Sequence, residues 1–194
     1  LDDHVTALEG DNAAGKTTVM IAFYTVLLPD MTRLRFTNVG EGEPTGGDRG
    51  IYGRLGVVGR PSYAFVEFVL HGGTTLLAGV RFERKTEPTV ELTPLMIEGL
   101  PSDVALSDVL LSRLGETDQV PELEELRESI ARQGARLTVF RSAKEYFTAL
   151  FDHGITPLRL LSDHERSRFN EMLRTSMTGG LSRALTSGFR TFLL

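Results

Sequence analysis

The spacing of apolar and polar residues at the start of the chain predicts a strand, a glycine-bounded loop and a buried helix. Residues 5–9 (VTALE) form a short apolar run that ends at Gly10, as expected of a buried strand. The stretch 16–28 (KTTVMIAFYTVLL) is apolar on most sides, contains no helix breaker and stops at Pro29. That pattern indicates a buried helix.

The middle of the chain has the pattern of antiparallel β-structure. Residues 29–61 are rich in Gly, Pro, Thr and Asp and predict a long irregular loop, which is uncommon above about 15 residues unless the loop is functional. β-Branched and aromatic residues then dominate three runs, at 62–70, 74–84 and 90–98. Because the turn sequence HGG separates the first two runs, we expect them to form a hairpin.

The second half of the chain is predicted to be mostly helical. Pro121 and the acidic residues after it are typical of a helix N-terminus, and Ser142 has the chemistry of an N-cap. The expected helices are 107–114, 121–133, 142–151, 163–177 (capped by Ser162 or Asp163) and 181–194, with one more short strand at 137–140. Alternating helical and β patterns of this kind predict an α/β fold.

Composition narrows the class of protein. The chain has 194 residues and no cysteine, which excludes disulfides, thiol catalysis and cysteine zinc sites and favours a reducing, cytoplasmic location. No apolar run approaches the roughly 18 residues of a membrane span, and the acidic start differs from a secretory signal. The chain begins without Met and close to a strand pattern, and its last predicted helix has no C-cap. We therefore expect a fragment of a longer protein.

Charge is unevenly distributed along the chain. The formal net charge is -5, but residues 157–194 hold six arginines against three acidic residues. Such a segment is compatible with a nucleic-acid-binding face and also with an ordinary helix surface of mixed charge, and the sequence leaves both interpretations open.

One motif carries specific chemistry. Residues 10–17 (GDNAAGKT) match G-x-x-x-x-G-K-[ST], the phosphate-binding loop. They lie between the predicted strand and the predicted helix, as that motif requires. Inward-pointing backbone N–H groups and the helix N-terminus would bind phosphate oxygens, a lysine ammonium would reach the β- and γ-phosphates, and a threonine hydroxyl would ligate Mg²⁺. The candidate nucleotide-binding residues are Gly10, Asp11, Asn12, Ala13, Ala14, Gly15, Lys16, Thr17 and Thr18, with Thr17 as the candidate Mg²⁺ ligand.

A second element of P-loop hydrolases is missing. These enzymes usually have an apolar strand that ends in Asp or Asp-Glu and orders Mg²⁺ and the attacking water. Residues 63–67 end in Glu but alternate like an exposed antiparallel strand, 76–80 are followed by Arg81, and 109–111 are followed by Ser112. The sequence therefore predicts a chain that binds a nucleotide and does not cleave it unaided.

The stretch GDNAAGKTTVMIAFYTVLLPDMTRLRFTN resembles the start of the ATPase head of MukB-type bacterial condensins, relatives of the structural-maintenance-of-chromosomes (SMC) proteins. RGIYGRL, IEGLP, FDHGI and the final stretch from residue 162 fit the same family in the same order, so the resemblance covers nearly the whole chain. It implies an ABC/SMC-type P-loop half-head with a mixed sheet, an antiparallel hairpin lobe (62–98) and a helical lobe (99–194) that leads to a coiled coil.

The resemblance also implies a split head. The C-terminal half, beyond the coiled coil and hinge, would carry the signature loop and the acidic strand, and a first strand would precede residue 1. Two heads would sandwich ATP, and the implied partners are the C-terminal half, a second copy, a kleisin with its accessory subunit, and DNA in the nucleoid. Arg159 matches a DNA-contacting position, whereas Leu161 stands where a second arginine is expected, and Ala13 replaces a frequent glycine.

Several other residues have competing interpretations. Gln133 could correspond to the Mg²⁺-facing glutamine of the superfamily or be a solvated helix end, and Asp48-Arg49 could face a nucleotide, a partner head or solvent. Residues 176–180 (SMTGG) resemble a signature loop but fit a helix break better, and the four histidines lack ligand spacing. The rival functions are a self-sufficient small P-loop kinase, an anti-plasmid or repair ATPase of the same architecture, and a DNA-binding scaffold with a vestigial phosphate loop.

Overall fold

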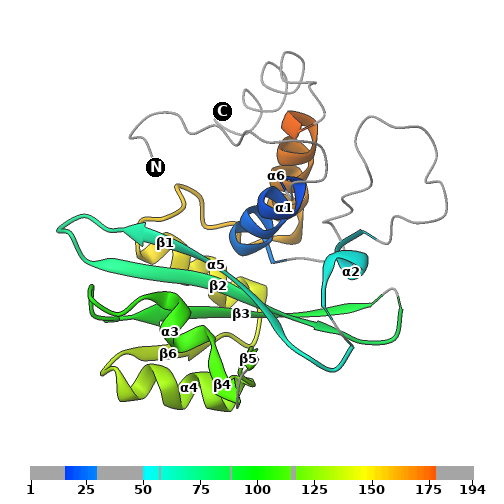
Figure 1. Cartoon of the computed structure of the whole chain (residues 1–194). Coiled ribbons are helices and arrows are strands. Elements are labelled where there is room, and N and C mark those ends of the chain that lie inside the picture. Colours follow the sequence, from blue (N-terminus) through cyan, green and yellow to red (C-terminus); the bar gives the residue numbers. More distant parts are fainter. Residues whose placement is uncertain (1–15, 30–49, 57, 88, 115–116, 178–194) are drawn as a thin grey trace.

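A four-stranded antiparallel sheet in the order β1-β2-β3-β6 lies at the centre of the computed structural model (Figure 1). The structure describes residues 16–29, 50–56, 58–87, 89–114 and 117–177. The strands are β1 (Ser62–Val69), β2 (Thr75–Arg84), β3 (Val90–Glu98) and β6 (Arg136–Val139). The three predicted β-runs, the hairpin joining the first two and the short strand near 137–140 are therefore confirmed.

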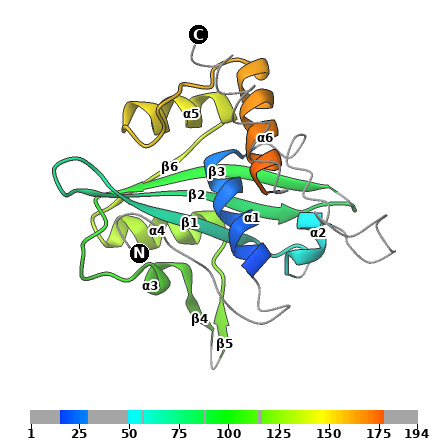
Figure 2. The same cartoon turned by 90° about the horizontal axis from the view of Figure 1, so that it is seen from above.

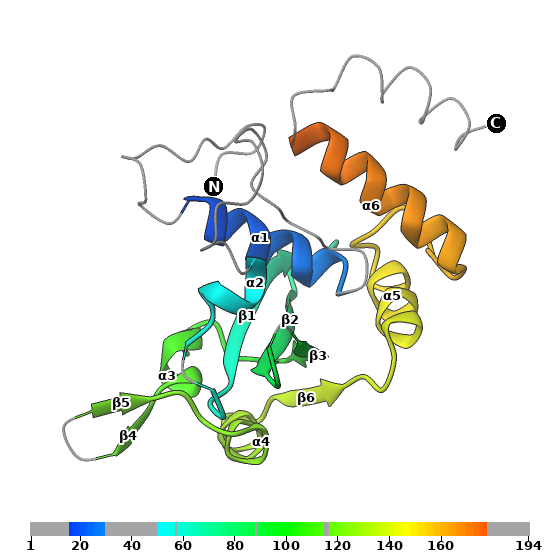
Figure 3. The same ribbon diagram turned by 90° about the vertical axis from the view of Figure 1, so that its right-hand side faces the viewer.

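Helices cover both faces of this sheet (Figures 1 and 3). On one face lie α1 (Lys16–Leu27) and α5 (Ala143–Asp152), and on the other lie α3 (Leu106–Leu110) and α4 (Leu123–Arg132). The short α2 (Gly50–Arg54) packs with the α1 face, and α6 (Asp163–Met177) follows α5. The predicted helices at 16–28, 121–133, 142–151 and 163–177 are confirmed to within a few residues.

Strand β2 divides the apolar interior into two cores. Leu76, Ala78 and Val80 pack with α1 and α5, whereas Leu77 faces the other way and packs with α3 and α4. Because successive side chains of a strand point to opposite faces, a central strand covered on both sides is apolar at nearly every position. This accounts for the uninterrupted LLAGV sequence.

Side-chain caps fix where two of the helices begin. Ser142 Oγ accepts a hydrogen bond from the Glu145 N–H (3.2 Å) at the start of α5. Ser162 Oγ accepts from the Glu165 N–H (3.1 Å), while Glu165 Oε2 accepts from the Ser162 N–H (2.8 Å) at the start of α6. The second arrangement is a reciprocal capping box, so Ser162 is the residue that caps α6.

The structure corrects three predictions. The helix expected at 107–114 ends at Leu110 and is followed by a hairpin of β4 (Ser112–Leu114) and β5 (Thr117–Gln119). Pro121 precedes the N-cap Glu122 and does not lie within α4. The predicted loop 29–61 contains helix α2 near its end.

Some predictions concern parts of the chain outside the described residues. They are the strand at 5–9, most of the glycine-rich loop and the helix at 181–194. Every strand pair in the described sheet is antiparallel, so the mixed sheet remains a prediction. No helix within the described ranges is long and apolar enough to cross a membrane.

Candidate functional site

The described part of the phosphate-loop motif is its C-terminal end. Lys16, Thr17 and Thr18 form the first turn of α1, which starts at Lys16. This start agrees with the motif, in which the lysine and threonine open the helix that follows the loop. Residues 10–15 of the motif lie outside the described residues.

Helix α1 is held in the core from Ile21 to its C-terminal end. Ile21 and Val26 are buried, and so is Leu28 directly after the helix, all within the core made with β2 and α5. The Thr25 hydroxyl donates a hydrogen bond to the Ile21 carbonyl (2.7 Å) and is thereby satisfied inside this core. Because this packing fixes the helix, it also fixes the direction of the helix N-terminus and the backbone position of Lys16 relative to the sheet.

A buried tyrosine links α5 to the end of α1. The Tyr146 hydroxyl donates to the Val26 carbonyl (2.9 Å), one of the last carbonyls of α1, which has no partner within the helix. The ring is fully buried, and this burial raises the pKa of Tyr146. The bond fixes the C-terminal end of the helix that the phosphate loop precedes.

We expect Tyr146→Phe to lower the free energy of unfolding by about 1–2 kcal/mol, because it leaves the Val26 carbonyl buried without a donor. Urea denaturation would measure the change. Tyr52→Phe is a suitable control, because the Tyr52 hydroxyl makes a longer bond (3.4 Å) to the Lys85 carbonyl and its loss should cost less. Equal losses for the two variants would contradict this assignment.

The end of the glycine-rich segment is fixed to the sheet by an arginine. The Arg84 guanidinium lies 4.2 Å from the centre of the Tyr52 ring, and its Nη1 donates to the carbonyls of Leu55 (3.3 Å) and Gly56 (2.5 Å). The short α2 is therefore held against the end of β2 on the face that also carries α1. Asp48-Arg49, the other candidate in this segment, lies outside the described residues.

Arg159, the candidate DNA contact, lies in the connection between Asp152 and Asp163. Figure 2 shows this connection between α5 and α6. The Arg159 side chain is 58% exposed, its guanidinium lies 4.7 Å from the centre of the Phe151 ring, and its Nη2 is 3.8 Å from Asp152 Oδ1. Leu161, at the position where a second arginine was expected, is also exposed. A single arginine that already has a carboxylate neighbour makes a weak phosphate contact at most.

A second arginine of segment 157–194, Arg166, has a structural role that its sequence pattern did not reveal. The Arg166 side chain is only 11% exposed; its Nη1 donates to the carbonyls of Leu160 (2.9 Å) and Leu161 (3.0 Å), and its Nη2 pairs with Asp163. Leu160 is the one non-glycine residue with positive φ among those described, at 47°. Arg166 therefore stabilises the turn into α6. Because its side chain is buried, segment 157–194 has less basic surface than its six arginines suggest.

The remaining candidates lie apart from α1. Gln133 is the exposed C-cap of α4, on the opposite face of the sheet, so the interpretation as a solvated helix end is confirmed. Ser176 belongs to α6, and residues 178–180 lie outside the described residues. His153 Nε2 is 3.7 Å from Glu98 Oε1, and the described residues contain no cluster of three or more ligands that could hold a metal.

Comparison with protein families gives a match over the full length of the chain. The model of the family described as MukB N-terminal matches residues 1–194. The match covers the phosphate-loop motif together with all described helices and strands.

Proposed function

The chain belongs to the MukB N-terminal family of SMC-like chromosome partition proteins, and we propose that it is the ATP-binding half of a head that dimerises around ATP and acts on DNA. The observation that carries this proposal is the phosphate-loop motif at 10–17, whose last two residues open a helix that is packed against the sheet. Backbone N–H groups of the loop and of the first turn of α1 would then both donate hydrogen bonds to the triphosphate.

The residues that would hold the nucleotide follow from the motif. Lys16 would bind the β- and γ-phosphates and Thr17 would ligate Mg²⁺, with Thr18 next to it in the first turn of α1. ATP bound there would supply the free energy released when its γ-phosphate is transferred to water. Of the two strands considered for the attacking water, β1 carries Glu67 on its exposed side and β2 continues into Arg81, so neither has the expected acidic end.

The outer side of α1 supports the proposal of a half-head. Val19 and Phe23 are four residues apart, so they lie on the same side of the helix, and they are 55% and 40% exposed. This side of α1 is therefore apolar and exposed. We propose that the C-terminal half of the same protein packs against this side and supplies the acidic strand and the signature loop.

The wider assembly follows from the family. The proposed partners are a second copy of the chain, a kleisin with its accessory subunit, and DNA, in the cytoplasm and on the nucleoid. Arg159 remains the candidate DNA contact because it is exposed, although the carboxylate of Asp152 beside it lowers the positive electrostatic potential there.

An ATP hydrolysis assay tests whether this chain is half of an ATPase head or a complete enzyme. We expect phosphate release by the chain alone to stay near the background of the buffer. Adding the C-terminal half of the protein should raise it by about 100-fold or more, because the added half would supply the groups that position the water and Mg²⁺. Steady turnover by the chain alone would instead support a self-sufficient kinase or NTPase.

A further inference from the structure

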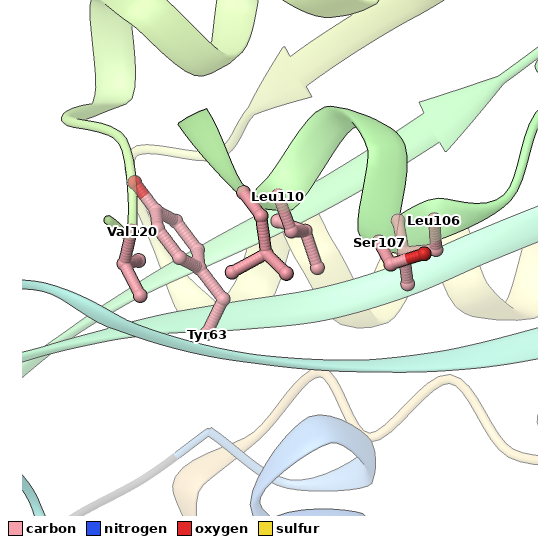
Figure 4. A pocket seen from close by; sticks show the side chains of 6 residues that line it. Tyr63, Leu106, Ser107, Leu110 and Val120 are labelled. Carbon is pink, nitrogen blue, oxygen red and sulfur yellow. The ribbon is translucent and has the colours of Figure 1, made fainter. Parts of the chain in front are cut away.

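An apolar groove opens on the face of the sheet opposite α1, between β1 and α3 (Figure 4). Its volume is about 380 Å³, within the range of about 300–1,000 Å³ of typical binding pockets. Leu111 and Val120, at its edge, are 45% and 44% exposed. The lining residues are Tyr63, Leu106, Ser107, Leu110, Leu111 and Val120.

The groove offers little to a small polar ligand. Only Tyr63 and Ser107 bring side-chain hydroxyls to the lining, and the Tyr63 hydroxyl already donates to the Pro121 carbonyl (3.1 Å). Small-molecule sites usually combine an apolar wall with several polar groups that fix the orientation of the ligand. This groove suits the apolar side chains of another polypeptide.

Acidic side chains flank the groove. Asp108 lies on α3, and Glu122 and Glu125 lie at the start of α4 next to Pro121, whose carbonyl the Tyr63 hydroxyl contacts, whereas Glu124 pairs with Arg127 (3.0 Å). Asp108 stands between lining residues and makes no ion pair within the described part of the chain. At the other end, burial raises the pKa of Tyr63 to about 12; Arg81 acts to lower it, and the smaller effects of Glu122 and Glu125 raise it.

The cation opposite Tyr63 in the sheet is already neutralised. Arg81, opposite Tyr63 in the β1–β2 ladder, pairs with Glu83 (2.5 Å) and with Glu122 (3.2 Å). Its positive charge therefore compensates neighbouring carboxylates and leaves the rim negative. An acidic rim repels nucleic acid and acidic peptides and attracts cationic ones.

We propose that this groove docks a basic amphipathic helix of a partner protein. Apolar side chains spaced at i, i+3, i+4 and i+7 would enter between Tyr63, Leu110 and Val120, in the helix-in-groove mode of recognition. Lysines or arginines on the flanks of that helix would face Asp108 and the start of α4. Because the groove and α1 lie on opposite faces of the sheet, this inference is independent of the proposed nucleotide site.

Fluorescence anisotropy with a labelled synthetic helix of about 18 residues, long enough to be helical, tests the apolar part. The probe has leucines at i, i+3, i+4 and i+7 and lysines elsewhere, and its twin has glutamates in place of the lysines. We expect the double variant Leu111→Ser/Val120→Ser to weaken binding of the lysine probe by about tenfold or more. Val69→Ser, an exposed apolar residue at the opposite end of β1 from Tyr63, should leave binding unchanged.

A charge reversal tests the acidic part. Asp108→Lys should weaken the lysine probe by about fivefold and reduce the salt dependence of binding, whereas Asp152→Lys on the other face should have little effect. Equal affinity for the two probes, or unchanged binding by the serine double variant, would overturn the proposal. It would also be overturned by a concentration-dependent dimer in sedimentation that the serine double variant abolishes, because the groove would then be covered by a second copy.

Discussion

Gly79→Ala is expected to destabilise the chain by about 3 kcal/mol, near the upper end of the usual cost of overpacking a core. A Cβ at this position would lie 2.2 Å from Phe65 Cδ1 and 2.8 Å from the Ala64 carbonyl oxygen. Gly79 pairs with Phe65 in the β1–β2 ladder, and the aromatic ring covers the glycine of the central strand. The ring could swing aside only by losing its packing, and the carbonyl is part of the ladder.

Urea or thermal denaturation would measure this loss, which corresponds to a fall in Tm of about 6–12 °C for a domain of this size. Gly56→Ala is the matched control, because an added Cβ there meets no atom within 4 Å. Adding Phe65→Ala to Gly79→Ala should cost less than the sum of the two single variants, because it removes the ring that the methyl group meets. Strict additivity would contradict the proposed clash.

Arg166→Met is expected to cost about 3 kcal/mol. Methionine keeps much of the side-chain volume but donates no hydrogen bonds, so the carbonyls of Leu160 and Leu161 lose their charged donor. The positive φ of Leu160 then loses the contact that holds it, and the turn between α5 and α6 loosens. The loss should also shorten α6 as measured by circular dichroism.

Arg168→Met separates this structural role from a general effect of charge. Arg168 is an exposed residue of the same helix, so its replacement should change the free energy of unfolding by less than about 0.5 kcal/mol. Equal losses for the two arginine variants would show that the burial of Arg166 does not determine stability.

The β-structure at 62–98 was predictable because its signals are local. Alternating β-branched and aromatic residues and the HGG turn determine both the strands and their pairing. The stretch 107–114 was assigned wrongly because a short apolar run fits a helix and a strand equally well. The register of Leu114 against Thr117 leaves a two-residue connection of Gly and Glu, a hairpin signal that the sequence analysis did not use.

The candidate site was predictable to a smaller extent. The start of α1 at Lys16 follows from the motif, but its fixation by Tyr146 joins residues 120 positions apart, which no local pattern reveals. The inward direction of Arg166 depends on the turn at Leu160, so sequence alone placed it with the surface arginines. The groove at Tyr63 likewise arises only when α3 packs over β1, although the acidic residues Asp108, Glu122 and Glu125 are visible in the sequence.

Calorimetric titration with ATP and Mg²⁺ tests the central claim most directly. Lys16 and Lys144 are two of only three lysines in the chain, and Lys144 is exposed on α5, so Lys144→Ala is a matched control. We predict saturable heat with the unmodified chain and with Lys144→Ala, and an affinity at least about thirtyfold lower for Lys16→Ala, which loses a charged phosphate contact. No heat with the unmodified chain, or the same heat with Lys16→Ala, would contradict the account.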